Sequence, residues 1–160
     1  MNLFSCNILL LAFLLVSPKM VSQEIIWSSV MAGQQEEYGN ALCVDSSGNT
    51  IITGSFQGIC YTPTPGPALF SLGANDIFVQ KISPTGTVLW TNQYGGSGAD
   101  NGHSVATDSS GNIYIAGTFT GLSYFGTGTL SSISTFDGTS VFVVKLDSNG
   151  NILWKKAYPG

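Results

Sequence analysis

Apolar and polar residues alternate in short blocks along this chain, and the same arrangement occurs twice. Residues 103–119, HSVATDSSGNIYIAGTF, repeat residues 40–56, NALCVDSSGNTIITGSF, with every position displaced by 63. Each copy holds two short apolar segments of the length and composition typical of β-strands. The shared Asp-Ser-Ser-Gly-Asn predicts a tight turn between them, because Asp can accept a backbone N–H two residues on and Gly adopts positive φ without strain. Each copy is therefore predicted to form a β-hairpin.

A second repeated block follows each hairpin. Residues 76–90, DIFVQKISPTGTVLW, correspond to residues 140–154, SVFVVKLDSNGNILW, at an offset of 64. Two apolar segments again flank a turn, at 83–86 in the first copy and 147–150 in the second. The one-residue change of offset falls in the connection between the blocks, as expected for surface loops, here at 61–67 and 121–134. Each copy is thus predicted to hold four strands in two hairpins.

One further strand precedes the first copy, since residues 24–27, EIIW, align with residues 87–90, TVLW. Four short antiparallel strands per unit, repeated in tandem, predict an all-β chain of β-propeller blades. The expected order is a lone fourth strand at 23–33, a four-stranded blade at 34–96 and a second at 97–160.

Alternation within the second blade predicts which residues share a face. Ile113, Ile115 and Phe119 are expected on one face and Tyr114 and Ala116 on the other. Small residues belong where neighbouring blades approach closely, and they include Ala106, Ala116 and Gly117.

Residues 1–22 differ from the rest of the chain. The run ILLLAFLLV at 8–16 is shorter than the ~20 apolar residues of a membrane-spanning helix, and it is typical of a secretory signal peptide that ends at Ser22. An uncleaved anchor and a buried strand are the alternatives, because no Lys or Arg precedes the run. The signal peptide predicts a secreted or cell-surface protein with no membrane span after its removal.

Charge argues against a nucleic-acid partner. The chain has a formal net charge of −4, and residues 23–160 contain four lysines, no arginine and all nine acidic residues. Lys155 and Lys156 form the only basic pair in the sequence. Nucleic-acid binding needs clustered Lys and Arg, so we expect none.

The cysteines and acids form no metal motif. Cys43 and Cys60 align with Ala106 and Ser123, so a disulfide between them and two free thiols both remain open. No Cys-x-x-Cys or Cys/His cluster suggests zinc. The turn that starts at Asp147 has its Gly fourth, whereas a calcium-binding EF-hand loop has it sixth. We therefore expect a plain turn, no metal and no cofactor.

Candidate catalytic residues are few. His103 aligns with Asn40, and no Ser or Cys motif accompanies it. Glu36, Glu37 and Asp100 precede the first strand of their copies, and a glycosidase needs paired carboxylates. Equivalent positions in successive blades lie apart, however, so each acid is better explained as a local loop cap. We expect no catalytic residue and no enzyme.

The order of these motifs resembles the bacterial SBBP propeller repeat. That repeat runs from a Trp and a Gly-Gly pair, through an Asp, to D-x-x-G-N-x-Y-x-x-G and a final F-x-x-K-x-x-x-x-G-x-x-x-W. The chain departs from it in the first copy, at Ala32-Gly33, Glu37 and Ile51. It matches the pattern in place at Trp90, Gly95, Gly96, Asp100, Asp108, Gly111, Asn112, Tyr114, Gly117, Phe142, Lys145, Gly150 and Trp154.

The resemblance implies a secreted or cell-surface bacterial protein, often long and multidomain, without an assigned reaction. A closed propeller has about four to eight blades, so we expect further blades in the same polypeptide or self-association into a ring. The expected function is a non-catalytic interaction or adhesion scaffold, with a protein or glycan ligand on its loops. The alternative is a carbohydrate-active enzyme or a carbohydrate-binding propeller.

Overall fold

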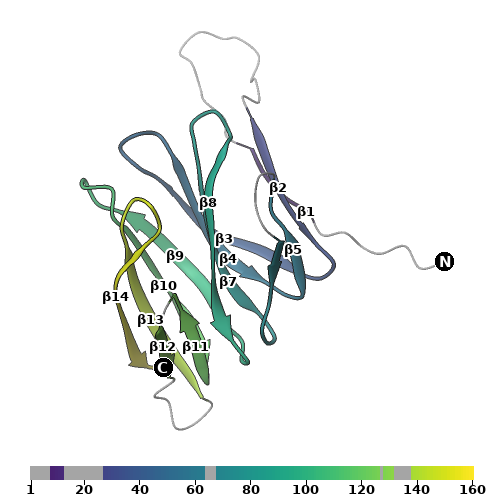
Figure 1. The fold of residues 1–160 in the computed structure, drawn as a ribbon, viewed down its shortest axis with the longest axis vertical. Coiled ribbons are helices and arrows are strands. Elements are labelled where there is room, and N and C mark those ends of the chain that lie inside the picture. Colours follow the sequence, from purple (N-terminus) through teal and green to yellow (C-terminus); the bar gives the residue numbers. More distant parts are fainter. Residues whose placement is uncertain (1–7, 13–26, 64–67, 127, 132–137) are drawn as a thin grey trace, which may run out of the picture.

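The computed structural model describes residues 8–12, 27–63, 68–126, 128–131 and 138–160. Its strands form three antiparallel sheets, as predicted for an all-β chain (Figure 1). The described part contains no helix with the length and hydropathy needed to cross a bilayer.

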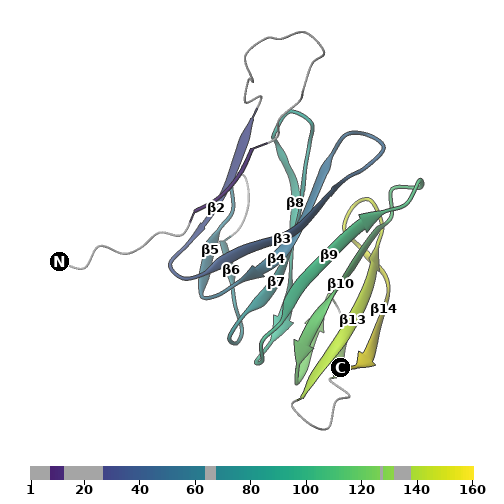
Figure 2. The same cartoon turned by 180° about the vertical axis from the view of Figure 1, so that it is seen from behind.

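Each copy of the repeat contains a four-stranded antiparallel blade, and the two blades stack side by side (Figures 1 and 2). The first blade consists of β3 (Glu37–Val44), β4 (Thr50–Phe56), β7 (Asp76–Ile82) and β8 (Val88–Gly96). The second consists of β9 (Asn101–Thr107), β10 (Ile113–Thr120), β13 (Thr139–Leu146) and β14 (Ile152–Pro159).

The predicted turn chemistry closes the first hairpin of each blade. In the second blade, Asp108 Oδ1 accepts hydrogen bonds from the backbone N–H of Ser110 and Asn112, at 3.0 and 2.9 Å. Gly111 has a φ of 78°, a conformation that a side chain would strain. The same bonds occur at the β3–β4 turn, around Asp45.

The connection inside each copy contains a hairpin that the sequence pattern did not predict. These hairpins are β5 (Ile59–Tyr61) with β6 (Ala68–Phe70), and β11 (Leu122–Phe125) with β12 (Gly128–Ser131). Each leaves its own blade and pairs with the last strand of the preceding unit: β11 with β8, and β5 with β2 (Ser28–Gly33). The prediction of loops at 61–67 and 121–134 was therefore wrong at Tyr61, 122–125 and 128–131, because strands of three or four residues are too short to show a period.

Strand β2 occupies the fourth-strand position before the first blade, while residues 23–26 lie outside the described residues. Strand β1 (Ile8–Ala12) comes from the predicted signal peptide and pairs with β2. Leu9 lies opposite Met31, as Ile77 of β7 lies opposite Tyr94 of β8. β1 therefore takes the place of a third strand, in line with the alternative of an apolar strand. The remainder of 1–22 lies outside the described residues, and the signal peptide stays a prediction.

The two blades differ in how their faces are covered. Every residue of β4 and β7 is buried, whereas buried and half-buried residues alternate along β10 and β13. One core lies between the blades and includes Ile51, Ile77, Ile113 and Phe142; a second lies between the first blade and β2 and includes Phe78. The first blade is thus covered on both faces and the second on one.

The predicted face assignment of the second blade is confirmed, but its glycine has a different purpose. Ile113, Ile115 and Phe119 are buried, and Tyr114 and Ala116 alternate with them on the half-buried face.

A Cβ at Gly117 would collide with the carbonyl oxygen of Asn101 and the ring of Phe142, both in the same blade. The expectation that Gly117 serves contact between blades was therefore wrong. Gly117 adjoins a β-bulge, where neighbouring strands of one blade approach closely. Ala106 and Ala116 lie on the less covered face, where Ala106 is exposed.

Candidate interaction site between the blades

Three turns at the same end of the two blades surround a polar cleft of about 550 Å³. They are the β3–β4 turn of the first blade and the β9–β10 and β13–β14 turns of the second, and all lie toward the upper end of the stack in Figures 1 and 2. The cleft therefore lies at the junction between the repeats, where both contribute to its lining.

A buried ion pair forms the floor of this cleft. Lys81 Nζ lies 3.0 Å from Asp45 Oδ2, and it also donates to the carbonyl oxygen of Ser148 in the second blade, at 3.2 Å. Burial of Asp45 opposes its ionisation, but hydrogen bonds from Asn49, Lys81 and Ser47 outweigh it and lower the pKa of Asp45 to about 2. Lys81 thus links a turn of each blade.

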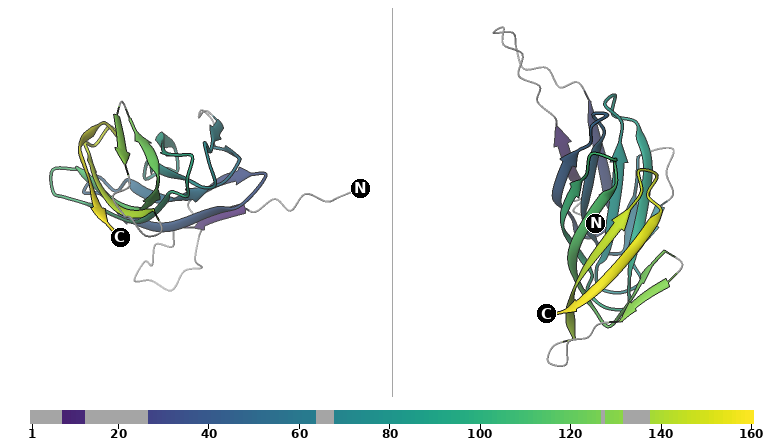
Figure 3. Two further views of the ribbon diagram at one scale, coloured as in Figure 1. Left: turned by 90° about the horizontal axis from the view of Figure 1, so that it is seen from below. Right: turned by 90° about the vertical axis from the view of Figure 1, so that its left-hand side faces the viewer.

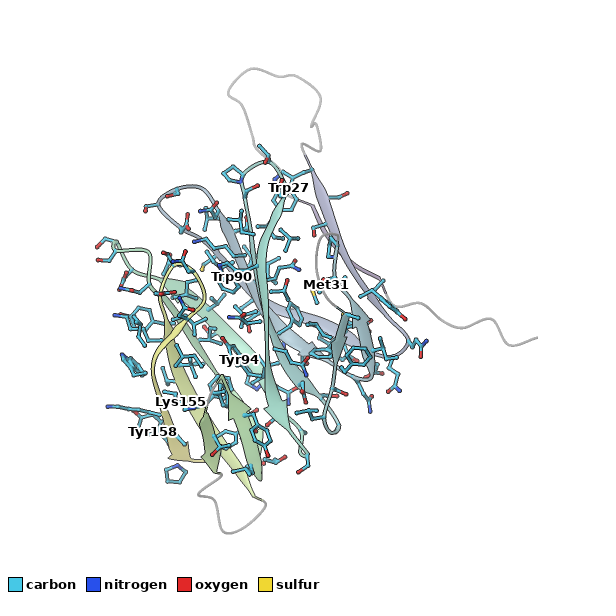
Figure 4. The ribbon with its side chains drawn as sticks, in the orientation of Figure 1. Trp27, Met31, Trp90, Tyr94, Lys155 and Tyr158 are labelled. Atoms are coloured by element: carbon cyan, nitrogen blue, oxygen red, sulfur yellow. The ribbon has the colours of Figure 1, made fainter. Side chains whose placement is uncertain are left out.

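Trp90 and Asn92 of β8 hold the β13–β14 turn. Trp90, which is labelled in Figure 4, donates from Nε1 to Ser148 O at 3.3 Å. Asn92 Nδ2 donates to Gly150 O at 2.8 Å. Gly150 has a φ of 84°, and a Cβ there would approach both side chains. Trp27 approaches Gly86 in the same way one repeat earlier. A contact between Trp and a turn Gly thus recurs at both junctions.

The outer face of the second blade repeats two of the three residues with which the first blade holds the β13–β14 turn. Trp154 and Lys145 are the equivalents of Trp90 and Lys81, and Trp154 is 39% exposed. Lys145 Nζ lies 4.8 Å from the centre of the Tyr114 ring, which meets Trp154 edge-on at 6.3 Å. Figure 3 shows this blade at the end of the stack. We name Tyr114, Lys145, Trp154 and Tyr158 the outer aromatic face.

A second cleft, of about 600 Å³, lies at the outer strands of the same junction. Its lining includes Tyr94, Phe125 and Lys155, of which Tyr94 and Lys155 are labelled in Figure 4. Phe125 stacks on Tyr94 at 5.3 Å, and Lys155 Nζ donates to Phe125 O at 2.8 Å. Burial lowers the pKa of Lys155. These contacts fix the β11–β12 hairpin over the junction.

Asp100 anchors that hairpin from inside the fold. Its carboxylate accepts hydrogen bonds from the Gly96 backbone N–H of the preceding blade and from the Ser123 hydroxyl of the hairpin. Burial raises the pKa of Asp100, and both hydrogen bonds reduce that rise.

Glu37 and Cys60 take the places of Asp100 and Ser123 at the earlier junction. Neither oxygen of the buried Glu37 carboxylate has a hydrogen-bond partner. Burial raises the pKa of Glu37, and the nearby Gly33 backbone reduces this rise. Burial and the charge of Glu37 raise the pKa of Cys60 to about 12. Glu37 and Asp100 thus lie at different junctions, each against the preceding unit.

Asp76, which no sequence motif marked, is a buried carboxyl group with a raised pKa. Its Oδ2 accepts a hydrogen bond from Gln93 Nε2 at 2.7 Å, while the buried Oδ1 has no partner. Burial raises the pKa of Asp76 to about 6; bonds from Gln93 and Leu72 oppose this rise, and the charge of Asp100 adds to it. Its alignment with Ser140 gave no sign of this burial.

The other residues considered from the sequence do not converge on a reaction centre. His103 is exposed on β9, with Nε2 3.0 Å from Thr118 Oγ1, and Glu36 accepts a hydrogen bond from the hydroxyl of Tyr38. Asp147 accepts the backbone N–H of its own turn at residues 149 and 151. Within the described ranges, no three His, Cys, Asp or Glu side chains gather around a point that could hold a metal.

The positions of Cys43 and Cys60 show whether they form a disulfide. Both thiols are free. Cys43 packs against the core between the blades, whereas Cys60 belongs to the core between the first blade and β2. The two side chains therefore face opposite sides of one blade, and the disulfide alternative is wrong for this fold.

Stacked four-stranded blades, with an Asp-x-x-Gly-Asn turn in each first hairpin and a Trp on the next turn Gly, define a β-propeller repeat protein. A family model described as SBBP, beta-propeller repeat, matches residues 89–118, from β8 into β10. The chain therefore carries an SBBP repeat, as the sequence resemblance predicted.

The chain is also similar in sequence to a viral protein, over a longer stretch than the family model. The chain is 30% identical, over 125 residues, to the uncharacterized WD repeat-containing protein L264 of Acanthamoeba polyphaga mimivirus. The aligned region is 71% of this chain and spans only 9% of that relative. The likeness supports a propeller module.

Proposed function

We propose that the chain is a non-catalytic β-propeller module, exported to the cell surface or the medium, that acts as an interaction scaffold. The observation that carries the proposal is the outer aromatic face. Its Lys145 and Trp154 occupy the positions of Lys81 and Trp90, with which the first blade holds the second. Its export rests on the leader pattern of residues 1–22.

The first partner we assign to this face is a further blade of the same repeat. Such a blade would place the Gly of its β13–β14-type turn over Trp154, as Gly150 lies over Trp90. Trp154 is 39% exposed, so covering it would remove further apolar surface from water, which is favourable. An uncovered apolar face of this kind marks an interaction surface.

A further blade fits this face better than an unaltered second copy of the chain. The complementary surface is the one that carries Phe119 and Phe142 in the second blade, and it packs on the first blade. Its counterpart in the first blade, with Phe56 and Phe78, is already packed in the core with β2. A second copy would therefore have to displace β2 before it could bind.

Repeating residues 97–160 after Gly160 tests this assignment. With Trp27, Trp90 and the added Trp all changed to Phe, Trp154 is the sole indole, and its emission should shift to the blue when the added blade covers it. Changing the added turn Gly, the equivalent of Gly150, to Ala should reverse the shift.

An unchanged emission and an unchanged melting temperature in the lengthened chain would contradict the proposal. Light scattering on the original chain distinguishes a further blade from a second copy as the partner. A concentration-dependent dimer with shifted Trp154 emission would favour self-association.

The carbohydrate-active enzyme is the weaker alternative. Its candidate carboxylates Glu37 and Asp100 are buried at separate junctions, and the exposed His103 has its Nε2 3.0 Å from Thr118 Oγ1. Carbohydrate binding without turnover has a specific observation in its favour, the polar cleft between the turns.

A further inference from the structure

The polar cleft between the three turns offers neutral hydrogen-bonding groups beside apolar side chains. Exposed Ser side chains of the β3–β4 and β9–β10 turns and the Asn149 amide line it, together with the side chains of Leu89 and Trp90. Its volume of about 550 Å³ is within the roughly 300–1,000 Å³ of small-molecule sites. A ligand must therefore combine many hydroxyl groups with an apolar surface.

The charged groups of the cleft are already neutralised. Lys81 and Asp45 are both more than nine-tenths buried and paired at 3.0 Å, and Lys81 also donates to Ser148 O. The Asp45 carboxylate accepts three further bonds from Ser47 and Asn49 near 2.9 Å, and a fourth at 3.2 Å. Lys81 is therefore not a free cation for an anionic ligand, and a metal ion at Asp45 would have to compete with four hydrogen bonds and an ammonium group.

We propose that this cleft binds a neutral oligosaccharide, with one sugar ring against Trp90 and its hydroxyl groups bonded to the turns. Sugar rings present apolar C–H faces and a rim of hydroxyls, which match an indole and a set of Ser and Asn side chains. The inference rests on the proposed scaffold role and names a ligand for it.

Fluorescence titration tests the assignment on the full chain. Trp27→Phe with Trp154→Phe leaves Trp90 as the sole reporter, and cellohexaose, maltohexaose and chitohexaose are the probes. We expect a saturable change in Trp90 emission with at least one of them. Asn149→Ala should weaken binding about fivefold, the loss of one neutral hydrogen bond.

The matched control is Thr85→Ala, which changes the equivalent position of the β7–β8 turn, outside the lining of the cleft. It should bind as tightly as the parent, and circular dichroism should show both variants folded. Saturation-transfer NMR with the unmodified chain supplies a second readout that does not depend on the Trp substitutions.

Three outcomes would overturn the assignment: no saturable response to any probe by either method, equal weakening by Asn149→Ala and Thr85→Ala, or tighter binding of oligogalacturonate than of the neutral probes. None of these bears on the lengthened chain, where Trp154 reports, so the two proposals fail separately.

Discussion

At the scale of single residues, the acidic side chains fall into two groups, those in the turns and those buried inside the fold. Asp45, Asp108 and Asp147 lie in the turns, where hydrogen bonds lower their pKa. Asp76 and Asp100 lie inside the fold, where burial raises it. The sequence identifies the first kind, because Asp-x-x-Gly-Asn is a local motif. It does not show that Asp76 and Asp100 are buried, because burial depends on contacts between segments far apart.

Asp76→Asn should stabilise the protein at neutral pH and have little effect near pH 3.5. The pKa of Asp76 is about 6 in the folded protein, against an ordinary value of 3.8. The unfolded chain therefore ionises first, and stability falls as pH rises through this window. The gain at pH 7.5 should reach about 3 kcal/mol at most. Urea denaturation at the two pH values measures it, and an equal effect at both would contradict the argument.

Asp147→Asn is the control, because its effect on stability at neutral pH should be opposite to that of Asp76→Asn. The pKa of Asp147 is lowered by hydrogen bonds from Asn151, so its carboxylate stabilises the fold above the unfolded pKa and loses that effect as pH falls through the folded value. The substitution should destabilise at pH 7.5, and the loss should shrink in acid.

At the scale of elements, the β11–β12 hairpin joins two blades that otherwise meet through turns and a shared core. It pairs with β8 at Gly95 and Gly96 and carries Phe125, which is 1% exposed, into the core between the blades. The eight blade strands follow from the repeated apolar blocks and their turns. The short hairpins do not, because the strand they pair with belongs to the preceding repeat.

Phe125→Ala should cost about 3–5 kcal/mol, as for other buried Phe residues, because it opens a cavity against Tyr94 and Phe142. Tyr124→Ala, one residue earlier and 50% exposed, should change stability by no more than about 0.5 kcal/mol. Chemical denaturation compares the two. Similar small losses would show that the hairpin is not part of the core.

At the scale of the whole molecule, stability is divided between two cores, one at each junction. The repeat offset predicts this stacking, and the alternation along β10 predicts which residues of the second blade share a face. The polar cleft could not be predicted, because its lining combines turns that are adjacent only after the blades stack.

Gly150→Ala and Gly111→Ala should distinguish the free energy lost to strain within a turn from the free energy lost at the contact between the blades. Both glycines have positive φ, 84° and 78°, so each substitution costs about 1–2 kcal/mol locally. A Cβ at position 150 would also press on Asn92 and Trp90, whereas one at 111 meets only Ser148 at ordinary contact distance. Gly150→Ala should therefore be the more destabilising and should red-shift Trp90 emission; equal effects would contradict a junction held by this turn.

Strand β1 fills the place beside β2 that a third strand of a complete blade would take. If the leader is cut off on export, as proposed, the N–H and C=O groups of β2 on that side lose their partners. Cleavage would then expose the edge of β2. In the precursor β1 covers this edge, whereas in the cleaved chain the edge can pair with a strand of another segment or another protein. Transport and assembly would thus occur in a fixed order.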